Sequence, residues 1–353
     1  MRAESTWPVG RLPLFSAAPA AYLSTASHES KQPSFAALAH SKPLTYNATL
    51  VGREDLTDTL AIFRVSPAAG ADGAAVPSFV AGQYAVLGLN NEAEPAKGHA
   101  RRAYSISSPP REKRWLEFYI RYVNQPTSDN PLTHLLWPLK AGDGIWLGPK
   151  IVGKFTLADT VGIDDPRFRL FVAAGTGLAP FVSILMQLAA GAASPGCSLE
   201  NVALLYGASH PQDMAYQRDL ERVLNRAGRH YYPTISRPHL HPEWSGDTGR
   251  VETFFDAEKL PDLEKRLGWK KGFLTPENSI IYICGLQGTI AETLIRLFKR
   301  GFVPNDRRLR QALKVPDHLS PTLFFEQYDT EPILDLTNQP FLDSLAKDFP
   351  AGT

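Results

Sequence analysis

An apolar run that ends in a glycine-rich turn is the feature that most restricts the fold of this chain. Residues 170–174 are apolar, and they lead through Gly175, Thr176, Gly177 and Pro180 into an amphipathic stretch, residues 181–190. This pattern predicts a buried strand and then a helix with proline in its first turn. Glycines at such a junction let the backbone approach the pyrophosphate of a dinucleotide. The third glycine of the full fingerprint is missing, so a plain strand-to-helix turn is the alternative.

Strands and helices alternate through the rest of the C-terminal half. The pairs are a strand at 202–206 with a helix at 214–226, a strand at 230–235 with a short helix at 250–255, and a strand at 279–284 with a helix at 288–300. This order predicts βαβ crossovers and a parallel sheet. Ligands of such sheets lie beyond the carboxyl ends of the strands. Three loops fall there: residues 175–180, Ser236-Arg237 and Cys284-Gly285.

A second segment, Arg102-Ala103-Tyr104-Ser105, has the chemistry to hold a flavin. Arginine offers a forked charged donor to a pyrophosphate, tyrosine a flat ring to an isoalloxazine, and serine a hydroxyl to a ring nitrogen. In a strand, Arg102 and Tyr104 project from one face. Taken alone, these four residues fit an ordinary edge strand equally well.

The surroundings of this segment indicate a small antiparallel barrel. Strands are expected at 79–87 and 115–122, and residues 139–145 read as a tight turn into another strand. Between them, residues 129–136 predict a short helix with Pro131 in its first turn, whose free N–H groups suit an anion. Thr133 can add a hydroxyl to the same phosphate, or it can be an ordinary first-turn residue.

The order of these motifs resembles the ferredoxin–NADP reductase family, and the Arg-Ala-Tyr-Ser form resembles its bacterial branch. The resemblance covers about residues 44–330. It implies a six-stranded antiparallel FAD-binding β-barrel at 43–160, followed by an α/β parallel-sheet NADP-binding domain at 165–330. Residues 1–42 are then a disordered N-terminal extension, and residues 331–353 a C-terminal tail.

The same resemblance implies roles for individual residues. Arg102 would bind the FAD pyrophosphate, with Ala103 next to it in the same cofactor site. Tyr104 would stack on the flavin, and Ser105 would lie near its N5 atom. The FAD phosphates would lie at Leu132 and Thr133, the NADP pyrophosphate at Gly175, Thr176, Gly177 and Pro180, and the nicotinamide between Cys284 and Gly285. In the aromatic strand near the C-terminus, Tyr328 would cover the flavin, with Glu326 as an orienting or proton-relaying carboxylate. Core packing is the alternative for that strand.

The choice between NADP and NAD depends on the end of the third strand of the parallel sheet. An acidic residue there binds the ribose 2′-hydroxyl of NAD, whereas arginine suits a 2′-phosphate. The strand ends in Ser236-Arg237 without an acid, and Arg250 follows. Both arginines match family positions that hold the 2′-phosphate, so NADP(H) is expected.

Composition sets limits on partners and location. A net charge of +1 in 353 residues argues against a nucleic-acid partner. Two cysteines, without metal-ligand spacing, are too few for a disulfide framework or an iron–sulfur cluster, and no metal is expected. No stretch of about 18 apolar residues spans a membrane. We therefore expect a soluble cytoplasmic monomer; residues 1–42 leave an organelle matrix, reached through a transit peptide, as the alternative.

These inferences predict reversible electron transfer between NADPH and a one-electron carrier, ferredoxin or flavodoxin. Two clusters of basic residues are candidate docking surfaces for an acidic carrier: Lys299, Arg300, Arg307, Arg308 and Arg310, and Lys150, Lys154, Arg167 and Arg169. The alternatives are a reductase component of an oxygenase, an NADPH-dependent quinone or flavin reductase, and a non-catalytic NADP- or flavin-binding sensor.

Overall fold

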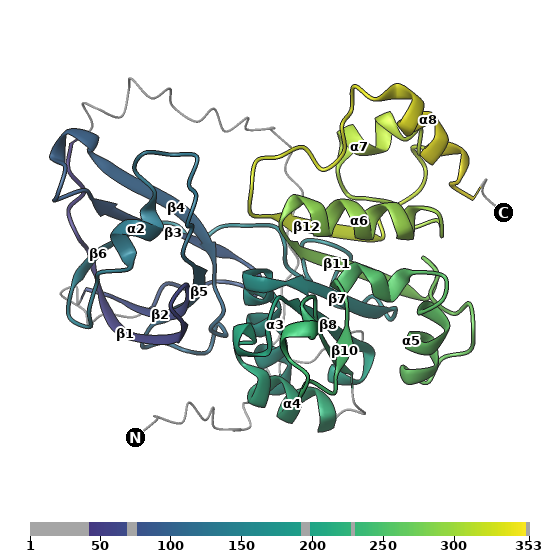
Figure 1. Ribbon diagram of the computed structural model, residues 1–353, viewed down its shortest axis with the longest axis horizontal. Coiled ribbons are helices and arrows are strands. Elements are labelled where there is room, and N and C mark those ends of the chain that lie inside the picture. The colour runs from purple at the N-terminus through teal and green to yellow at the C-terminus, as the bar shows by residue number, and fades with distance from the viewer. Residues whose placement is uncertain (1–41, 69–75, 192–197, 227–229, 351–353) are drawn as a thin grey trace.

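The computed structural model describes residues 42–68, 76–191, 198–226 and 230–350. Two six-stranded sheets organise this part of the chain, and they lie side by side in Figure 1. Cys197, and nearly all of the predicted N-terminal extension, lie outside the described residues.

The first sheet is antiparallel and has the order β4-β3-β6-β1-β2-β5. Its strands are β1 (Ala48–Thr57), β2 (Leu60–Pro67), β3 (Tyr84–Asn90), β4 (His99–Ser105), β5 (Leu116–Arg121) and β6 (Gly144–Leu147). Ile106 bridges to Phe118, which joins the two edge strands and closes the sheet into a barrel. Alternate residues such as Phe63, Leu87 and Phe118 fill its interior. The predicted six-stranded barrel is confirmed.

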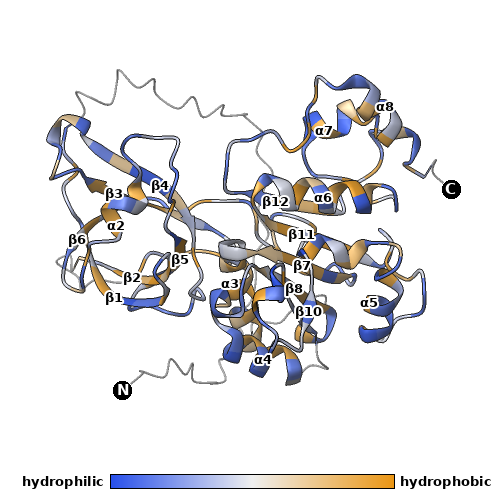
Figure 2. Cartoon of the chain, in the orientation of Figure 1, coloured by the Kyte–Doolittle hydropathy of each residue, from blue (hydrophilic) through white to orange (hydrophobic). Residues whose placement is uncertain are grey.

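The second sheet is parallel throughout and has the order β10-β9-β8-β7-β11-β12. Its strands are β7 (Phe168–Ala174), β8 (Val202–Ala208), β9 (Tyr231–Ile235), β10 (Asp247–Thr248), β11 (Ser279–Gly285) and β12 (Leu323–Gln327). Figure 2 shows that β7 and β11, at its centre, are largely hydrophobic. Strands with both faces buried read as continuous apolar runs, which is why the sequence predicted them well.

Helices cover both faces of the parallel sheet. They are α3 (Ala179–Ala189), α4 (Gln217–Arg226), α5 (Leu260–Arg266), α6 (Gln287–Phe298), α7 (Arg307–Ala312) and α8 (Gln339–Lys347). Successive strand residues serve opposite faces: Phe171 packs in the cluster with α3 and α4, and Leu170 in the cluster with α5 and α6. The barrel adds one short helix, α2 (Leu132–Leu136), beside β3 and β4.

Two predicted helix boundaries were wrong. Helix α4 begins at Gln217 and not at residue 214, because Tyr216 adopts a left-handed φ of 58° that a helix does not continue through. Pro131 is the residue before α2, outside its first turn. The short helix predicted at 250–255 is present as a 3₁₀ helix, Val251–Phe255.

Residues 331–350 pack onto the second domain and include α8. Ile333, Leu334, Leu342 and Leu345 are buried in the apolar cluster that also contains residues of α6. Asp329 accepts a hydrogen bond from the backbone N–H of Gln287, at the start of α6, over 2.9 Å. The chain after Tyr328 is therefore held against α6, and Figure 1 shows it running above that helix to α8.

A buried polar network holds the barrel against the second domain. Tyr119 of β5 donates to the carbonyl of Asp213 over 2.6 Å. Tyr216 donates to Glu117 over 2.8 Å, and Arg64 donates to the other oxygen of the same carboxylate over 2.6 Å. These contacts fix the segment that follows β8 against strand β5 of the barrel.

Candidate functional site

Three predicted catalytic residues meet where the two domains touch. Ser105, the last residue of β4, donates its hydroxyl to Glu326 Oε2 over 2.6 Å, although the two residues are 221 positions apart. Cys284 and Glu326 are paired in the register of the parallel strands β11 and β12. The Cys284 Sγ atom lies 4.0 Å from the same carboxylate oxygen. The fold thus brings a hydroxyl, a thiol and a carboxyl group into one cluster.

Burial sets the protonation of this cluster. It raises the pKa of the Glu326 carboxyl to about 7, against the lowering effect of the hydrogen bond from Ser105. Burial, and next the charge of Glu326, raise the pKa of the Cys284 thiol well above its usual range. A neutral thiol is a poor nucleophile, so Cys284 has the properties of a packing residue. Glu326, in contrast, can gain or lose a proton near neutral pH.

Tyr328 is tied to both domains. Its backbone N–H donates to the Gly285 carbonyl over 3.2 Å, and its phenol hydroxyl donates to the Thr176 carbonyl over 3.4 Å. Arg102 of the barrel donates to the Tyr328 carbonyl over 3.1 Å. Burial, and next Cys284, raise the pKa of the Tyr328 phenol well above its usual range. Tyr328 therefore lies beside the cluster of Ser105, Cys284 and Glu326. That its ring covers the flavin remains a prediction.

The donors on and beside β4 suit FAD. Arg102 and Ala103 are exposed, and one guanidinium nitrogen of Arg102 is used by Tyr328. The Tyr104 hydroxyl is buried and has no hydrogen-bond partner among the described residues. A hydroxyl-rich ligand would satisfy it, and the remaining guanidinium donors fit a pyrophosphate. The orphaned Tyr104 hydroxyl and the remaining Arg102 donors therefore fit FAD.

Leu132 and Thr133 lie at the start of α2 and are buried. The Thr133 Oγ1 atom accepts a hydrogen bond from the backbone N–H of Val123 over 3.4 Å, which leaves the hydroxyl proton for another acceptor. A phosphate contact by Thr133 remains a prediction.

The two glycines of the turn after β7 have different functions. Gly175 has φ +54°, and open space surrounds the position that a side chain would occupy. A Cβ atom on Gly177 would lie 2.1 Å from the carbonyl oxygen of Cys284. Gly177 thus permits close packing on β11, while Gly175 leaves the turn open to a ligand. Thr176 lies between them, and Pro180 is buried in the first turn of α3.

The predicted 2′-phosphate residues lie side by side at the carboxyl edge of the sheet. Gly249 N–H donates to the Ile235 carbonyl over 2.9 Å, which brings Ser236-Arg237 next to Arg250. Both arginines and Ser236 are exposed. Arg250 also pairs with Glu252, so its charge is partly neutralised.

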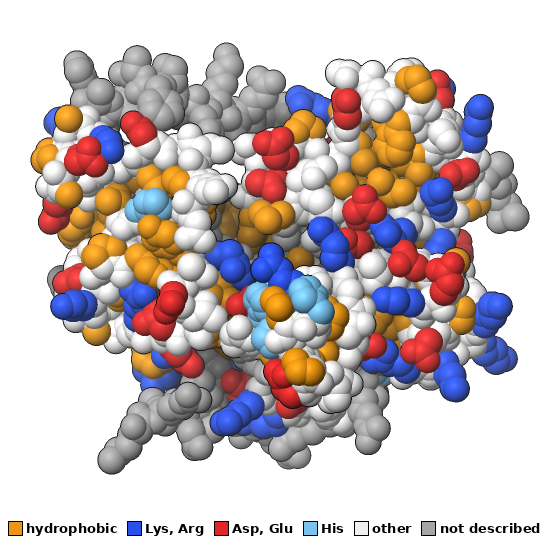
Figure 3. Space-filling model, viewed as in Figure 1, with side chains coloured by type: hydrophobic (Ala, Val, Ile, Leu, Met, Phe, Trp, Pro, Cys, Tyr) orange, Lys and Arg blue, Asp and Glu red, His pale blue; other side chains and the backbone are white. Residues whose placement is uncertain are grey.

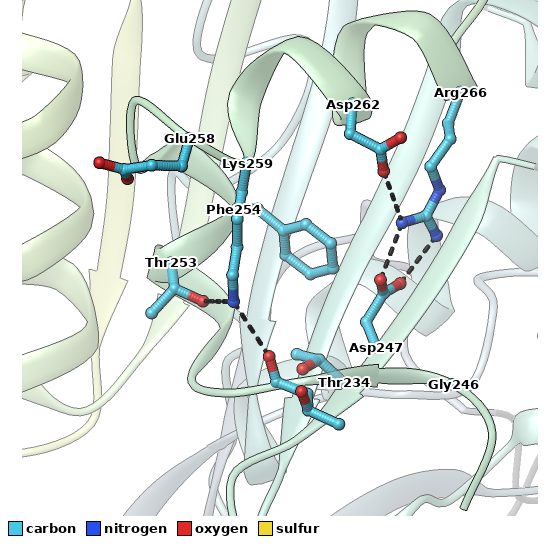
Figure 4. Close-up of a pocket in the computed structure, with 10 residues that line it drawn as sticks. Thr234, Gly246, Asp247, Thr253, Phe254, Glu258, Lys259, Asp262 and Arg266 are labelled. Atoms are coloured by element: carbon cyan, nitrogen blue, oxygen red, sulfur yellow. Dashed lines mark hydrogen bonds and ion pairs between the residues drawn. The ribbon is translucent and has the colours of Figure 1, made fainter.

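Behind the turn that carries Arg250 lies a surface hollow of about 350 Å³. Lys259 reaches into it and donates to the Thr248 carbonyl and to Thr253 Oγ1, over 3.1 Å in each case (Figure 4). An ion pair between Arg266 and Asp247 closes the other side. Lys259 therefore supports the turn from behind; its spacing in the sequence gave no sign of this function.

The prediction of a second docking cluster, at Lys150, Lys154, Arg167 and Arg169, was partly wrong. Arg169 is fully buried and donates to the carbonyls of Gly162 and Asp165, so it cannot meet a partner. Lys150 and Lys154 are exposed, as predicted. In the first cluster, Lys299 pairs with Asp348 over 2.9 Å, so part of its charge is neutralised.

No helix among the described residues is long and apolar enough to cross a membrane. No group of three or more His, Cys, Asp or Glu side chains in the described ranges could hold a metal ion.

Comparison with known proteins places the chain in a family. Residues 171–293 match the oxidoreductase NAD-binding domain. Ferredoxin–NADP reductase B of Sorangium cellulosum is 33% identical over 209 residues, covering 58% of this chain and 73% of that protein. The flavodoxin/ferredoxin–NADP reductase of Rhodobacter capsulatus is 31% identical over 215 residues, covering 58% and 71%.

A solved structure agrees with the fold. The ferredoxin NADP⁺ reductase of Neisseria gonorrhoeae, with bound FAD and NADP, superposes with a TM-score of 0.60 at 22% identity. The match covers 80% of this chain and 98% of that one. The chain belongs to the ferredoxin–NADP reductase family of oxidoreductases.

Proposed function

We propose that this protein is an FAD-dependent oxidoreductase that transfers electrons reversibly between NADPH and a one-electron carrier protein, ferredoxin or flavodoxin. The observation that carries this proposal is the hydrogen bond between Ser105 and Glu326, with Cys284 beside it. It joins the flavin-binding motif of the barrel to the ends of strands where a nicotinamide would lie.

Bound FAD would accept a hydride from NADPH and release the electrons one at a time; the protein supplies binding, alignment and proton transfer. Arg102 and the start of α2 hold the flavin nucleotide, and the open turn at Gly175 receives the NADP pyrophosphate. Gly285 and Cys284 form the wall of the nicotinamide pocket. As a carboxylate, Glu326 accepts the Ser105 hydroxyl at Oε2. In its protonated form it donates to the Ser105 oxygen instead, and the Ser105 hydroxyl relays the proton to the reacting face. Tyr328 covers that face until the nicotinamide displaces its ring.

A mixed apolar and basic surface next to Ser105 suits an acidic carrier. Ser105 pairs with Tyr84 in the barrel, and Tyr84 pairs with Val152. Because neighbouring strands are about 4.8 Å apart, Val152 lies roughly 10 Å from Ser105. Val152 is 40% exposed, and the exposed Lys150 and Lys154 lie on either side of it in the sequence. Electron transfer requires such proximity between the flavin and the docked carrier.

Reversing both lysine charges, Lys150→Glu with Lys154→Glu, should raise the KM for an acidic ferredoxin or flavodoxin by about tenfold or more at low salt. The rate with ferricyanide, a small acceptor, should stay within about twofold, because the flavin site is untouched. Steady-state assays with NADPH and each acceptor measure both effects. Turnover of ferricyanide by the wild type also separates a reductase from a non-catalytic sensor.

Lys270→Glu with Lys271→Glu is the matched control. Both lysines are exposed, and they follow Trp269, which packs on Phe168 at the opposite, amino end of β7. Equal loss of carrier reduction in the two double variants would show that net charge alone matters. No loss in either would contradict docking at Val152.

Removing the two arginines at the nucleotide edge, Arg237→Ala with Arg250→Ala, should raise the KM for NADPH by about tenfold or more. The KM for NADH, which lacks the 2′-phosphate, should change little, so NADH is the internal control. Initial-rate measurements with both nucleotides test the assignment. Similar increases for both nucleotides would show that the arginines do not contact the 2′-phosphate.

A further inference from the structure

Two histidines share a hydrogen bond at the nucleotide edge of the parallel sheet. His210 Nδ1 lies 2.8 Å from His241 Nε2. Arg237 Nη1 lies 3.5 Å from the other ring nitrogen of His210, and Glu243 lies 3.3 Å from the other ring nitrogen of His241. Figure 3 shows histidine side chains gathered beside lysine and arginine side chains near the centre of this face. The four residues form one chain of contacts.

One tautomer of each ring satisfies all three contacts. A guanidinium can only donate, so in that tautomer His210 Nε2 accepts from Arg237 and His210 Nδ1–H donates to His241 Nε2. His241 Nδ1–H then donates to Glu243. A further proton on His210 Nε2 would face the Arg237 guanidinium, and this repulsion is removed only when an anion lies between them.

The position of His210 in the fold connects it to the dinucleotide. Ala208 and Ile235 are paired in register, and Ser236 N–H donates to the Ala208 carbonyl over 3.0 Å. His210 and Arg237 therefore follow the adjacent ends of β8 and β9. A dinucleotide whose pyrophosphate lies at Gly175, after β7, extends across β8 toward β9. In dinucleotide-binding folds, residues at these strand ends contact the 2′ position of the ribose.

We propose that His210 is a specificity residue for the 2′-phosphate of NADP, acting with Arg237, and that it takes up one proton from solvent when the phosphate binds. His210 Nε2–H then donates to a phosphate oxygen, while Nδ1–H keeps the ring in place against His241. The inference rests on the proposed NADP site at this edge. It adds to that proposal a preference for NADP over NAD that grows as the pH falls.

The charged groups around His210 support proton uptake when the phosphate binds. Among the described residues, the charged groups within hydrogen-bonding distance of the pair are Arg237 and Glu243, and the Glu243 side chain is 70% exposed. Asp213, in the turn after His210, lies 3.8 Å from Arg121. Within the described ranges, the side-chain partners of His210 are His241 and Arg237, and neither is a carboxylate that could hold the added proton in the free protein. The phosphate dianion supplies the missing negative charge.

Titration calorimetry on the FAD-loaded protein, with NADP⁺ and NAD⁺ as probes, tests the proposal. The ratio of the two affinities should rise several-fold between about pH 8 and about pH 6.5, where histidine gains its charge. Measurements in two buffers of different ionisation enthalpy count the protons exchanged. The amide of His210→Gln can still donate a hydrogen bond but cannot titrate. In this variant the ratio of NADP⁺ affinity to NAD⁺ affinity should no longer rise as the pH falls, and proton uptake should be smaller than in the wild type.

Two further variants keep the outcome decisive. His210→Asn can keep the hydrogen bond to His241 and should show the same loss, so a folding defect in one variant does not hide the effect. His318→Gln, at an exposed histidine between α7 and β12, should behave as the wild type. An unchanged pH dependence in His210→Gln and His210→Asn would overturn the proposal. Absence of NADP⁺ binding to the wild type at either pH would instead overturn the proposed NADP site itself.

Discussion

Replacing Arg102 by alanine should release most of the FAD from the purified protein. A hydrogen bond to a charged group contributes about 1.5–3 kcal/mol, so the Kd for FAD should rise by roughly 10- to 150-fold. A second effect of the substitution is also expected. Arg102 donates a hydrogen bond to the Tyr328 carbonyl over 3.1 Å, and the alanine variant loses this contact between the barrel and the second domain. Fluorescence titration of the apoprotein with FAD measures the affinity, and the absorption spectrum of the purified variant reports the flavin that it retains.

Arg101→Ala is a close control, since Arg101 is the preceding residue of the same strand. Its guanidinium lies 5.8 Å from the centre of the Trp146 ring, on the opposite face of β4. FAD affinity should stay within about threefold of the wild type in this variant. If Arg101→Ala lost FAD and Arg102→Ala kept it, the assignment of the flavin-facing side of β4 would be wrong. Release of FMN in place of FAD would contradict the pyrophosphate contact.

Much of the fold could be predicted because its strands carry strong local signals. The run around Leu170–Ala173 has both faces buried, and the glycines at 175 and 177 can be explained by a turn and a close approach. The helix after β8 was placed three residues too early. The sequence there continues the helical pattern, whereas the packing of Tyr216 on Glu117 requires a left-handed φ. Tertiary contacts of this kind override local preference.

The candidate site likewise contains residues that the sequence predicted and contacts that it did not predict. Ser105, Cys284, Glu326 and Tyr328 were predicted from their places in three separate motifs, and the structure brings them together. The contacts of His210 and Lys259 were not predicted, because each depends on loops that meet only in the folded sheet. Arg169 appeared in the sequence as one of several basic residues, yet its guanidinium is buried among backbone carbonyls. Charge patterns alone do not distinguish an exposed arginine from one that holds a loop.

Replacing Glu326 by glutamine should remove a pH dependence near neutrality from the reaction. Burial raises the pKa of Glu326 to about 7, so the wild-type side chain is a proton donor below this value and a carboxylate above it. We expect kcat for NADPH-dependent ferricyanide reduction to change through this range in the wild type and to vary much less in Glu326→Gln. Ser105→Ala should reduce kcat by about 100-fold or more, because it removes the relay but leaves the carboxyl group.

The same carboxyl group should affect stability with a sign that follows from its raised pKa. Between its unfolded value of 4.5 and about 7, Glu326 holds a proton in the folded chain and has lost it in the unfolded chain. The free energy of unfolding therefore falls as the pH rises through this window, and the destabilisation is complete above about pH 7. Glu326→Gln cannot ionise, so its Tm relative to that of the wild type should increase from about pH 5 to about pH 8. A constant difference in Tm, together with an unchanged pH profile of kcat, would show that Glu326 does not titrate in this range and that another group carries the proton.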